Sequence, residues 1–412
     1  MDKRGYEMYK YLILGAGPAG LAFANKLKDA GEESFLVLEK EAVAGGLCRS
    51  ENVGGFPFDL GGGHFLDVKN PIVSKYLFRF MPESEWLLYQ RDSRIDINGR
   101  QIGYPIEANI WQADLMEQVE YLKSIAAAGC NIGRIMPQKF VDWIYWKLGK
   151  KIAEDYMIPY NQKMFGENLN DLGTYWLEKL PDVSFEETLL SCLKRKPYGK
   201  QPGHAWFYYP KKFGYGEVWI RMAHVICNHV LYHENIVELD FDKRTVTDEN
   251  GNVYQAEQII TTIPWKSLKK ITGMPVSLVK LLDKLRHSSI RTDYYPHQLN
   301  TDAHWIYCPD KNLAYHRILV RHNFCPESTG YWTETNMDRA GFAALPSAFS
   351  YINEYAYPLN TLEKPLVMNK ILSFAKSRQI YGLGRWGEHE HYNSDVTVAR
   401  AFQLFEFIKS SR

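Results

Sequence analysis

Residues 9–39, YKYLILGAGPAGLAFANKLKDAGEESFLVLE, contain the pattern that decides the fold. The apolar run at 9–14 predicts a short strand, and residues 18–30 carry apolar side chains at helical spacing. Residues 34–39 predict a second strand. The stretch is therefore a βαβ unit with a short turn between its first strand and its helix.

The turn of this unit has three glycines with separate expected roles. Gly15 permits the tight turn, Gly17 lets the backbone approach a pyrophosphate, and Gly20 lets helix and strand pack closely. The helix N-terminus adds free N–H groups and a favourable dipole for phosphate. Glu39 ends the second strand, where an acid accepts hydrogen bonds from an adenosine ribose. The unit predicts a dinucleotide site.

Composition limits the remaining possibilities. A chain of 412 residues exceeds the size of one hydrophobic core, so two or three domains are expected. Lys and Arg total 49 against 48 acids, which argues against nucleic-acid partners. Six scattered cysteines without a CxxC pair predict a reducing compartment, with no disulfide and no metal site. Without a run of eighteen apolar residues, we expect no membrane insertion and a cytoplasmic protein.

The rest of the chain changes character several times. Residues 110–190 are mainly helical in pattern. Strand patterns return at 236–246 and 253–263, with the turn sequence DENG between them. Residues 285–365 are tyrosine-rich and β-like, and 380–412 predict a strand, a loop and a closing helix. The first domain is therefore expected to be discontinuous.

Two further glycine pairs favour FAD as the dinucleotide. The acid Glu39, the pair before Leu47-Cys48-Arg49, and the later Asp59-Leu-Gly-Gly together resemble the flavin-containing amine oxidase superfamily. The resemblance places the first pair along the FAD pyrophosphate and the second against the isoalloxazine. Ordinary turn chemistry is the alternative for both pairs. The implied cofactor residues, beyond the first turn and Glu39, are Gly45, Gly46, Gly61, Gly62, His64, Val237 and Arg385.

Several segments resemble one branch of that superfamily, the UDP-galactopyranose mutases. They are GYPIEANI at 103–110, EDYMIPYNQKMF at 154–165, WIY with YHR at 305–317, and GRWGEHEHYNSD at 384–395. The resemblance implies nucleotide contacts from Tyr104, Glu107, Asn161 and Phe165, and substrate contacts from Lys179, Trp305, Tyr307, Arg317, Tyr357 and His391.

Arg317 is the principal predicted substrate residue, because a guanidinium offers a rigid fork of donors to two phosphate oxygens. Lys179 stands where the family has a second phosphate-binding arginine, so the charge remains without the fork. Arg317, Lys179 and His64 are the predicted catalytic residues. Two departures leave the substrate open, namely Glu107 in place of glutamine and His391 in place of tyrosine.

Each of these functional roles has a purely structural alternative. An isolated aromatic residue is more often core than ligand contact. His64 can be a hydrogen-bonded loop histidine, and Arg385 can be a structural salt-bridge partner.

The expected fold class is α/β. A Rossmann-like FAD-binding domain is expected from residues 1–85, 195–275 and 366–412. A helical substrate domain is expected at 86–194, and a mixed or antiparallel β-sheet substrate domain at 276–365.

The resemblance implies an isomerase that interconverts pyranose and furanose forms of an NDP-sugar of the UDP-galactose type, in cell-surface polysaccharide biosynthesis. It implies reduced FAD whose N5 forms an adduct with the sugar, no net redox change, NAD(P)H as a candidate external reductant, and a small-molecule nucleotide sugar as partner. An oligomer is compatible with the sequence. The alternatives are an FAD-dependent oxidase or desaturase, whose apolar pocket should lack Arg317 and Asn161, and a flavin-bound regulatory protein without turnover.

Overall fold

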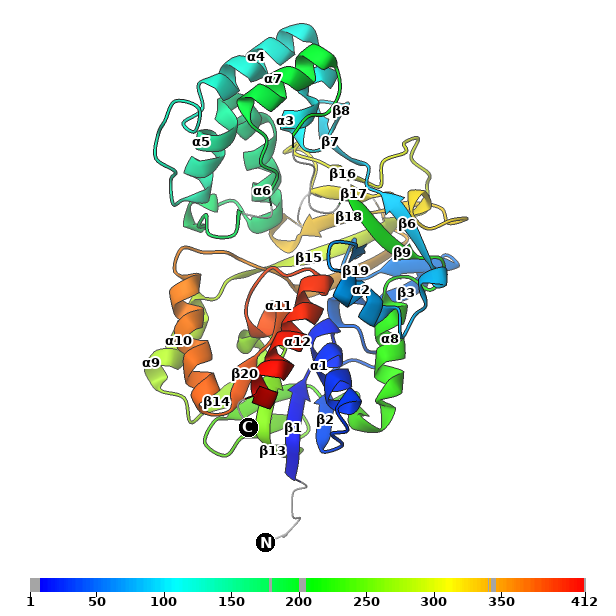
Figure 1. Ribbon diagram of the computed structural model, residues 1–412, viewed down its shortest axis with the longest axis vertical. Coiled ribbons are helices and arrows are strands. Elements are labelled where there is room, and N and C mark those ends of the chain that lie inside the picture. The colour runs from blue at the N-terminus through cyan, green and yellow to red at the C-terminus, as the bar shows by residue number, and fades with distance from the viewer. Residues whose placement is uncertain (1–7, 178–179, 200–204, 340, 342–345, 411–412) are drawn as a thin grey trace.

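The computed structural model describes residues 8–177, 180–199, 205–339, 341 and 346–410. In this part of the chain, an eight-stranded sheet with covering helices lies below a seven-stranded sheet, and a group of helices lies above both in Figure 1. The two sheets form two layers of the molecule, and the candidate site lies where these layers and the helical group meet.

The βαβ unit forms as the sequence predicts. It consists of β1 (Met8–Leu14), α1 (Pro18–Asp29) and β2 (Phe35–Leu38). Strand β1 lies between β2 and β13 (Val253–Thr261) and runs parallel to both. Leu14 pairs with Leu38 on one side and Thr261 on the other, so the three strands end at the same edge.

The other strands extend this sheet in the order β10-β2-β1-β13-β12-β11-β14, and β20 also pairs with β13. They are β10 (Val230–Leu231), β11 (Ile236–Asp240), β12 (Thr245–Asp248), β14 (Lys270–Thr272) and β20 (Ile380–Gly382).

The prediction of one strand over 236–246 is wrong. The Asp240 carboxylate accepts hydrogen bonds from the N–H groups of Asp242 and Lys243, which turns the chain between β11 and β12. The two strands then pair antiparallel. The predicted turn after β12 is present, because β12 and β13 are also antiparallel neighbours.

Both faces of the parallel region are buried. Ile13 packs in one apolar cluster with α1, α8 (Gly216–Val225) and α12 (Ser394–Ser410). Leu12 packs in a second cluster with α10 (Lys364–Ser377). Successive side chains of a strand point to opposite faces, which explains the continuous apolar run in β1. The buried strands therefore hold the following turns in fixed positions.

The seven-stranded sheet has the order β19-β15-β18-β17-β16-β7-β8. Within the described part of this sheet, only the pairing of β16 with β7 is parallel. The sheet is therefore mixed and mostly antiparallel. The predicted fold class is confirmed. Its strands are β7 (Ser93–Ile97), β8 (Arg100–Gly103), β15 (His287–Tyr295), β16 (Trp305–Tyr307), β17 (Arg317–Leu319), β18 (Tyr331–Asn336) and β19 (Phe349–Pro358).

The helical group is drawn at the top of Figure 1. It contains α3 (Ile106–Asn109), α4 (Leu115–Ala126), α5 (Phe140–Ile152), a π-helical turn (Ala153–Met157), α6 (Ile158–Phe165) and α7 (Phe185–Lys194). Helix α6 contacts β15 and β18, and the Asn336 side chain donates a hydrogen bond of 3.0 Å to the Met164 carbonyl. This contact fixes α6 over the seven-stranded sheet.

Smaller elements complete the described chain. They are β3 (Ser50–Val53), β4 (Phe56–Asp59), β5 (Leu66–Asp67), α2 (Pro71–Leu77), β6 (Trp86–Gln90), β9 (Trp206–Pro210), α9 (Val276–Val279) and α11 (Gly384–Gly387). The proposed domain boundaries stay a prediction, although β7 and β8, expected in the helical domain, pair into the seven-stranded sheet. Among the described residues, no helix has the length and apolar character needed to cross a membrane.

A fully buried arginine joins the β3–β4 hairpin to the seven-stranded sheet. Arg321 Nη1 donates to the carbonyls of Val53, Phe56 and Pro57 in the β3–β4 hairpin at 3.0–3.3 Å. Its Nη2 donates to the Tyr294 hydroxyl at 2.6 Å. Since the hairpin leads directly into the loop at 60–64, Arg321 positions that loop against the seven-stranded sheet.

We expect Arg321→Met to lower the free energy of unfolding by about 3 kcal/mol or more, because the substitution leaves several buried carbonyls without donors. Chemical denaturation followed by fluorescence measures the change. Arg378→Met is the matched control, since Arg378 forms a half-exposed ion pair with Asp242 at 3.2 Å and should change stability by less than about 1 kcal/mol. Equal effects of the two substitutions would contradict the assigned role.

Candidate functional site

Two cavities of about 540 and 550 Å³ lie between the layers. The first lies at the carboxyl ends of β1, β2 and β13, where parallel sheets bind ligands. The second lies between the helical group and the seven-stranded sheet. His64, Tyr392 and Ser394 line both, so the cavities share one boundary.

Glu39 lies at the end of β2 in the first cavity. Its carboxylate accepts hydrogen bonds from the N–H groups of Ala16 at 2.7 Å and Glu41 at 3.0 Å. Burial raises the pKa of Glu39, and these two N–H groups oppose the shift. The carboxylate is thus held in one orientation with further acceptor capacity, as a ribose contact requires.

The glycine turn is closely packed. An added Cβ at Gly15, whose φ is +99°, would lie 2.6 Å from the Thr262 hydroxyl. One at Gly20 would lie 2.0 Å from the Gly15 carbonyl oxygen. Gly17 caps α1 without a side-chain hydrogen bond, and it lies next to Gly46 in the wall of the first cavity, since an added Cβ at Gly46 would be 3.2 Å from the Gly17 Cα. The N–H groups at the start of α1 thus face the space where a pyrophosphate would lie.

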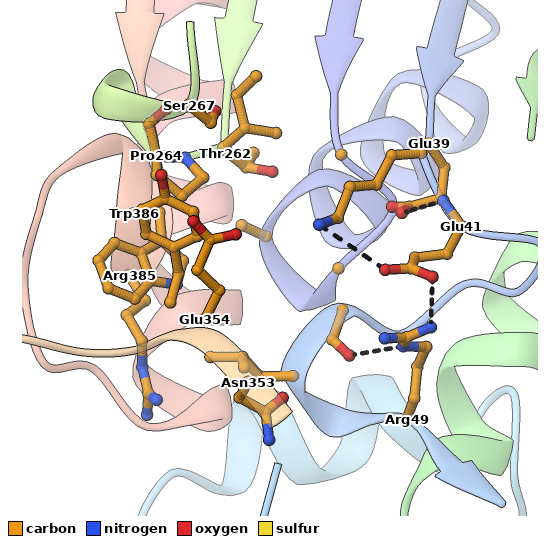
Figure 2. Close-up of a pocket in the computed structure, with 18 of the residues that line it drawn as sticks. Glu39, Glu41, Arg49, Thr262, Pro264, Ser267, Asn353, Glu354, Arg385 and Trp386 are labelled. Atoms are coloured by element: carbon orange, nitrogen blue, oxygen red, sulfur yellow. Dashed lines mark hydrogen bonds and ion pairs between the residues drawn. The ribbon is translucent and has the colours of Figure 1, made fainter. Parts of the chain in front are cut away.

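Two arginines border the first cavity from opposite sides in Figure 2. Arg49 pairs with Glu41 at 3.0 Å and donates to the Tyr351 hydroxyl at 2.6 Å. Arg385 donates only to backbone carbonyls among the described residues, two bonds to Tyr392 and one to Ala356. Arg385 therefore forms no salt bridge in this part of the chain, and its positive charge stays at the cavity wall.

The second glycine loop is closely packed. Gly61 and Gly62 are not among the residues that line the two cavities, and neither is Gly45. An added Cβ at Gly61 would lie 2.0 Å from the Leu47 carbonyl, and one at Gly62 would lie 2.0 Å from Glu334 Oε1. These glycines allow close backbone contacts that bring His64 to the shared boundary. Their direct contact with a cofactor stays a prediction.

His64 is placed between two cationic side chains. Burial lowers the pKa of His64 to about 3, and the charge of Arg385 acts in the same direction. Nε2 is buried and forms no hydrogen bond within the described residues. The imidazole is therefore neutral at physiological pH, and its Nε2 lies against the Gly61 backbone, where an added Cβ would be 2.7 Å away. This differs from a loop histidine with both nitrogens engaged.

Arg317 lies in the second cavity but already has a partner. Its Nε donates to Glu334 Oε2 at 3.1 Å and its Nη2 to the same oxygen at 2.5 Å. Burial alone would lower the pKa of Arg317, but the Glu334 charge raises it well above its usual value. Burial likewise opposes the shift at Glu334, whose pKa Arg317 and His316 hold at about 2. The pair is ionised and nearly neutral as a unit.

Aromatic residues and one amide form the other walls of the second cavity. Asn161 donates to the Met157 carbonyl at 2.6 Å, so its side-chain oxygen is oriented away from that bond. Phe165 lies edge-on to Trp176 with centroids 6.1 Å apart. The predicted residues that line this cavity are Tyr104, Asn161, Phe165, Trp305, Tyr307, Arg317, His391 and His64.

Three further predicted residues do not line the second cavity, and a fourth lies outside the described residues. Val237 lines the first cavity, as an adenine contact would. Tyr357 is buried behind the second cavity, where its hydroxyl accepts from Arg317 Nη2 at 3.3 Å and its ring lies 4.9 Å from His391. Glu107 is buried outside both cavities. Lys179 lies outside the described residues.

Several lining residues were not predicted. Arg91 and Tyr160 line the second cavity, as does Glu390, which pairs with the buried Lys364 at 2.7 Å. Glu334 supports Arg317 from behind. Arg91 precedes β7 in a stretch without a recognisable motif, and only its position beside an expected strand could have pointed to it.

Comparisons with known proteins agree with this geometry. A family model described as an NAD(P)-binding Rossmann-like domain matches residues 13–80. An uncharacterized protein in the nifH2 3' region of Methanothermococcus thermolithotrophicus is 48% identical over 52 residues, which are 13% of this chain and 49% of that protein. The chain therefore matches about half the length of this curated relative. Residues 13–80 belong to a Rossmann-type dinucleotide-binding domain.

Solved structures extend the similarity to the whole chain. A reduced UDP-galactopyranose mutase is 22% identical, with 98% of this chain and 96% of that chain covered at a TM-score of 0.88. A CLA-producing fatty acid isomerase from P. acnes is 14% identical, with 97% and 98% covered at 0.65. A putrescine oxidase with redesigned cofactor binding is 13% identical, with 98% and 99% covered at 0.64. The chain shares the fold of these enzymes, which confirms the fold expected from the sequence resemblance.

The burial of Glu107 predicts a pH effect on stability. Burial raises the pKa of Glu107 to about 7 from an ordinary value of 4.5. A carboxyl with a raised folded pKa stabilises the fold fully only below its unfolded pKa, and this contribution is lost as the pH rises through 7. We expect the free energy of unfolding of Glu107→Gln, measured relative to that of wild type, to increase by roughly 2–3 kcal/mol between pH 4.5 and pH 8.

Thermal unfolding of both proteins at several pH values measures this difference. Glu238→Gln is the control, because Glu238 forms an exposed pair with Lys270 at 2.9 Å. A stability difference between Glu107→Gln and wild type that does not change with pH would show that the carboxyl is not buried in its neutral form.

Proposed function

We propose that the protein is an FAD-dependent sugar-nucleotide mutase that interconverts pyranose and furanose forms of an NDP-sugar of the UDP-galactose type. The observation that carries the proposal is the joining of a dinucleotide cavity to a polar cavity with an aromatic wall, an amide and arginines. A sugar nucleotide needs these groups, and its sugar would reach the shared boundary at His64.

The residues of the first cavity fit FAD. The start of α1 and the Gly46 backbone would hold the pyrophosphate, Glu39 the ribose, and Val237 the adenine. The isoalloxazine would then lie near Arg385 and His64, which both line this cavity. When bound and reduced, FAD supplies a nucleophile for the anomeric carbon and is regenerated without net redox change.

The protein itself must bind the nucleotide and hold the departing diphosphate close to the sugar. Phe165 would stack on the base and the Asn161 oxygen would accept from its edge. The Arg317 guanidinium, fixed by Glu334 and Tyr357, would donate to phosphate oxygens. His64 is neutral near pH 7, so its role is to orient neighbouring groups rather than to supply a cationic acid.

An oxidase is the second candidate, because putrescine oxidase shares the fold. The second cavity disfavours it for apolar substrates, since Arg317 and Asn161 both line that cavity. Buried polar groups without ligand partners would be costly in a pocket built for an apolar molecule.

The proposal is tested with the purified flavoprotein reduced by dithionite under anaerobic conditions. UDP-galactofuranose and UDP-galactose are added separately, and chromatography follows their interconversion, with the oxidised protein as control. Conversion by the reduced protein alone is expected. Bound flavin without conversion of any NDP-hexose, together with oxygen consumption on an amine, would favour the oxidase.

Phe165→Leu should weaken UDP binding by about 1–3 kcal/mol, since it removes the plane on which the base stacks. Phe165→Trp should retain the affinity, because the larger ring keeps that plane. Fluorescence titration of both variants against wild type measures the effect. Equal UDP affinity in the leucine variant would remove Phe165 from the nucleotide site.

A further inference from the structure

The second cavity contains an arginine that forms no ion pair within the described residues, although the carboxyl residues Asp67, Glu390 and Asp395 also line the cavity. Arg91 and Arg317 are the arginines that line it within the described residues. Arg317 is held by the Glu334 carboxylate at 2.5 Å. Arg91 forms no ion pair in the described chain. A dianionic ligand would therefore be attracted more strongly to the Arg91 side of the cavity than to the neutralised pair.

Aromatic packing fixes the Arg91 guanidinium in place. The guanidinium carbon lies 4.4 Å from the centre of the Trp305 ring and 5.5 Å from that of Tyr104. Nε donates to the Ser93 hydroxyl at 2.6 Å, and Nη2 donates to the Tyr307 hydroxyl at 2.5 Å. No hydrogen bond from Nη1 occurs within the described residues. The fork is pre-oriented, with donors remaining for a ligand.

The Tyr307 hydroxyl adds a donor beside this fork. It accepts from Arg91 Nη2 and from the Trp305 indole N–H at 3.1 Å, so both of its lone pairs are engaged. Its own proton then needs an acceptor, and no protein acceptor for it lies in the described chain. Arg91 and Tyr307 together present donors only, which matches an anion and disfavours a neutral hydroxyl or an amine.

We propose that Arg91, with Tyr307, forms a phosphate-binding subsite that receives the diphosphate of the nucleotide ligand. The subsite rests on the proposed function for the identity of that ligand. Trp305 acts as a positioning residue, since it holds both the guanidinium and the hydroxyl. Arg91 then supplies the charge, and the Arg317–Glu334 pair supplies fixed geometry.

The test compares the binding of uridine, UDP and inorganic pyrophosphate to the flavin-loaded protein by calorimetry. We expect Arg91→Gln to raise the UDP Kd by roughly 10- to 100-fold, as for loss of charge-assisted hydrogen bonds, with uridine affinity changed by less than about 3-fold. The UDP Kd of Arg91→Lys should lie between those of wild type and Arg91→Gln, because lysine keeps the charge and loses the fork of donors. It should also keep the salt dependence of UDP binding that Arg91→Gln loses.

Arg94→Gln is the matched control, since Arg94 lies three residues further along the chain and pairs with Asp92 at 2.6 Å outside the cavity. It should leave UDP affinity unchanged. Near-ultraviolet circular dichroism and thermal unfolding verify that each variant keeps the packing around Trp305.

The outcomes separate this subsite from the proposed function. Equal UDP affinity in wild type and Arg91→Gln would overturn the subsite and leave the proposed function standing. Arg91-dependent pyrophosphate binding without UDP binding would support the subsite and count against a uridine nucleotide. Equal losses of uridine and UDP affinity in Arg91→Gln would assign Arg91 a structural role. Binding of neither UDP nor pyrophosphate by wild type would overturn both proposals.

Discussion

The architecture depends on how the buried guanidinium groups find partners. A buried cation is costly unless it is hydrogen bonded, and the fully buried Arg321 and three partly buried arginines at the two cavities have different kinds of partner. Arg321 binds carbonyls of the β3–β4 hairpin, Arg385 binds carbonyls near the C-terminal helix, Arg317 binds a carboxylate, and Arg91 lies on an indole ring. Arg321 holds segments of the chain together, Arg385 both holds segments together and lines the first cavity, and Arg317 and Arg91 line the second cavity.

Local sequence patterns predicted the strands, the helix and the glycine turn that form the wall of the first cavity. The turn glycines, Glu39 and the strands around them are close in sequence, and their roles follow from backbone geometry alone. The partner of Arg317 could not be predicted in the same way, because Glu334 lies 17 residues away and meets it only through strand pairing. Glu107 is a different case. Its motif suggested a ligand contact, which stays a prediction, and the structure shows the residue buried and not among those that line the two cavities.

Burial and the charged side chains around His64 determine its protonation state at the boundary between the two cavities. Burial and the charge of Arg385 disfavour protonation of His64, whereas the opposing charges of Glu334 and Arg317 largely offset each other. The neutral imidazole thus leaves the positive charge of Arg385 available to an anionic ligand in the first cavity. The boundary therefore carries no imidazolium that could act as a proton donor near pH 7.

Only three side chains, among those described, are common to the two cavities. Under the proposed function, the cofactor and the nucleotide sugar would therefore be held by almost separate sets of residues. Replacements around Glu390 and His391 would then alter substrate recognition without changing the residues that line the first cavity. A fold divided in this manner would allow new specificities to arise from few replacements, which accords with the variety of enzymes that share it.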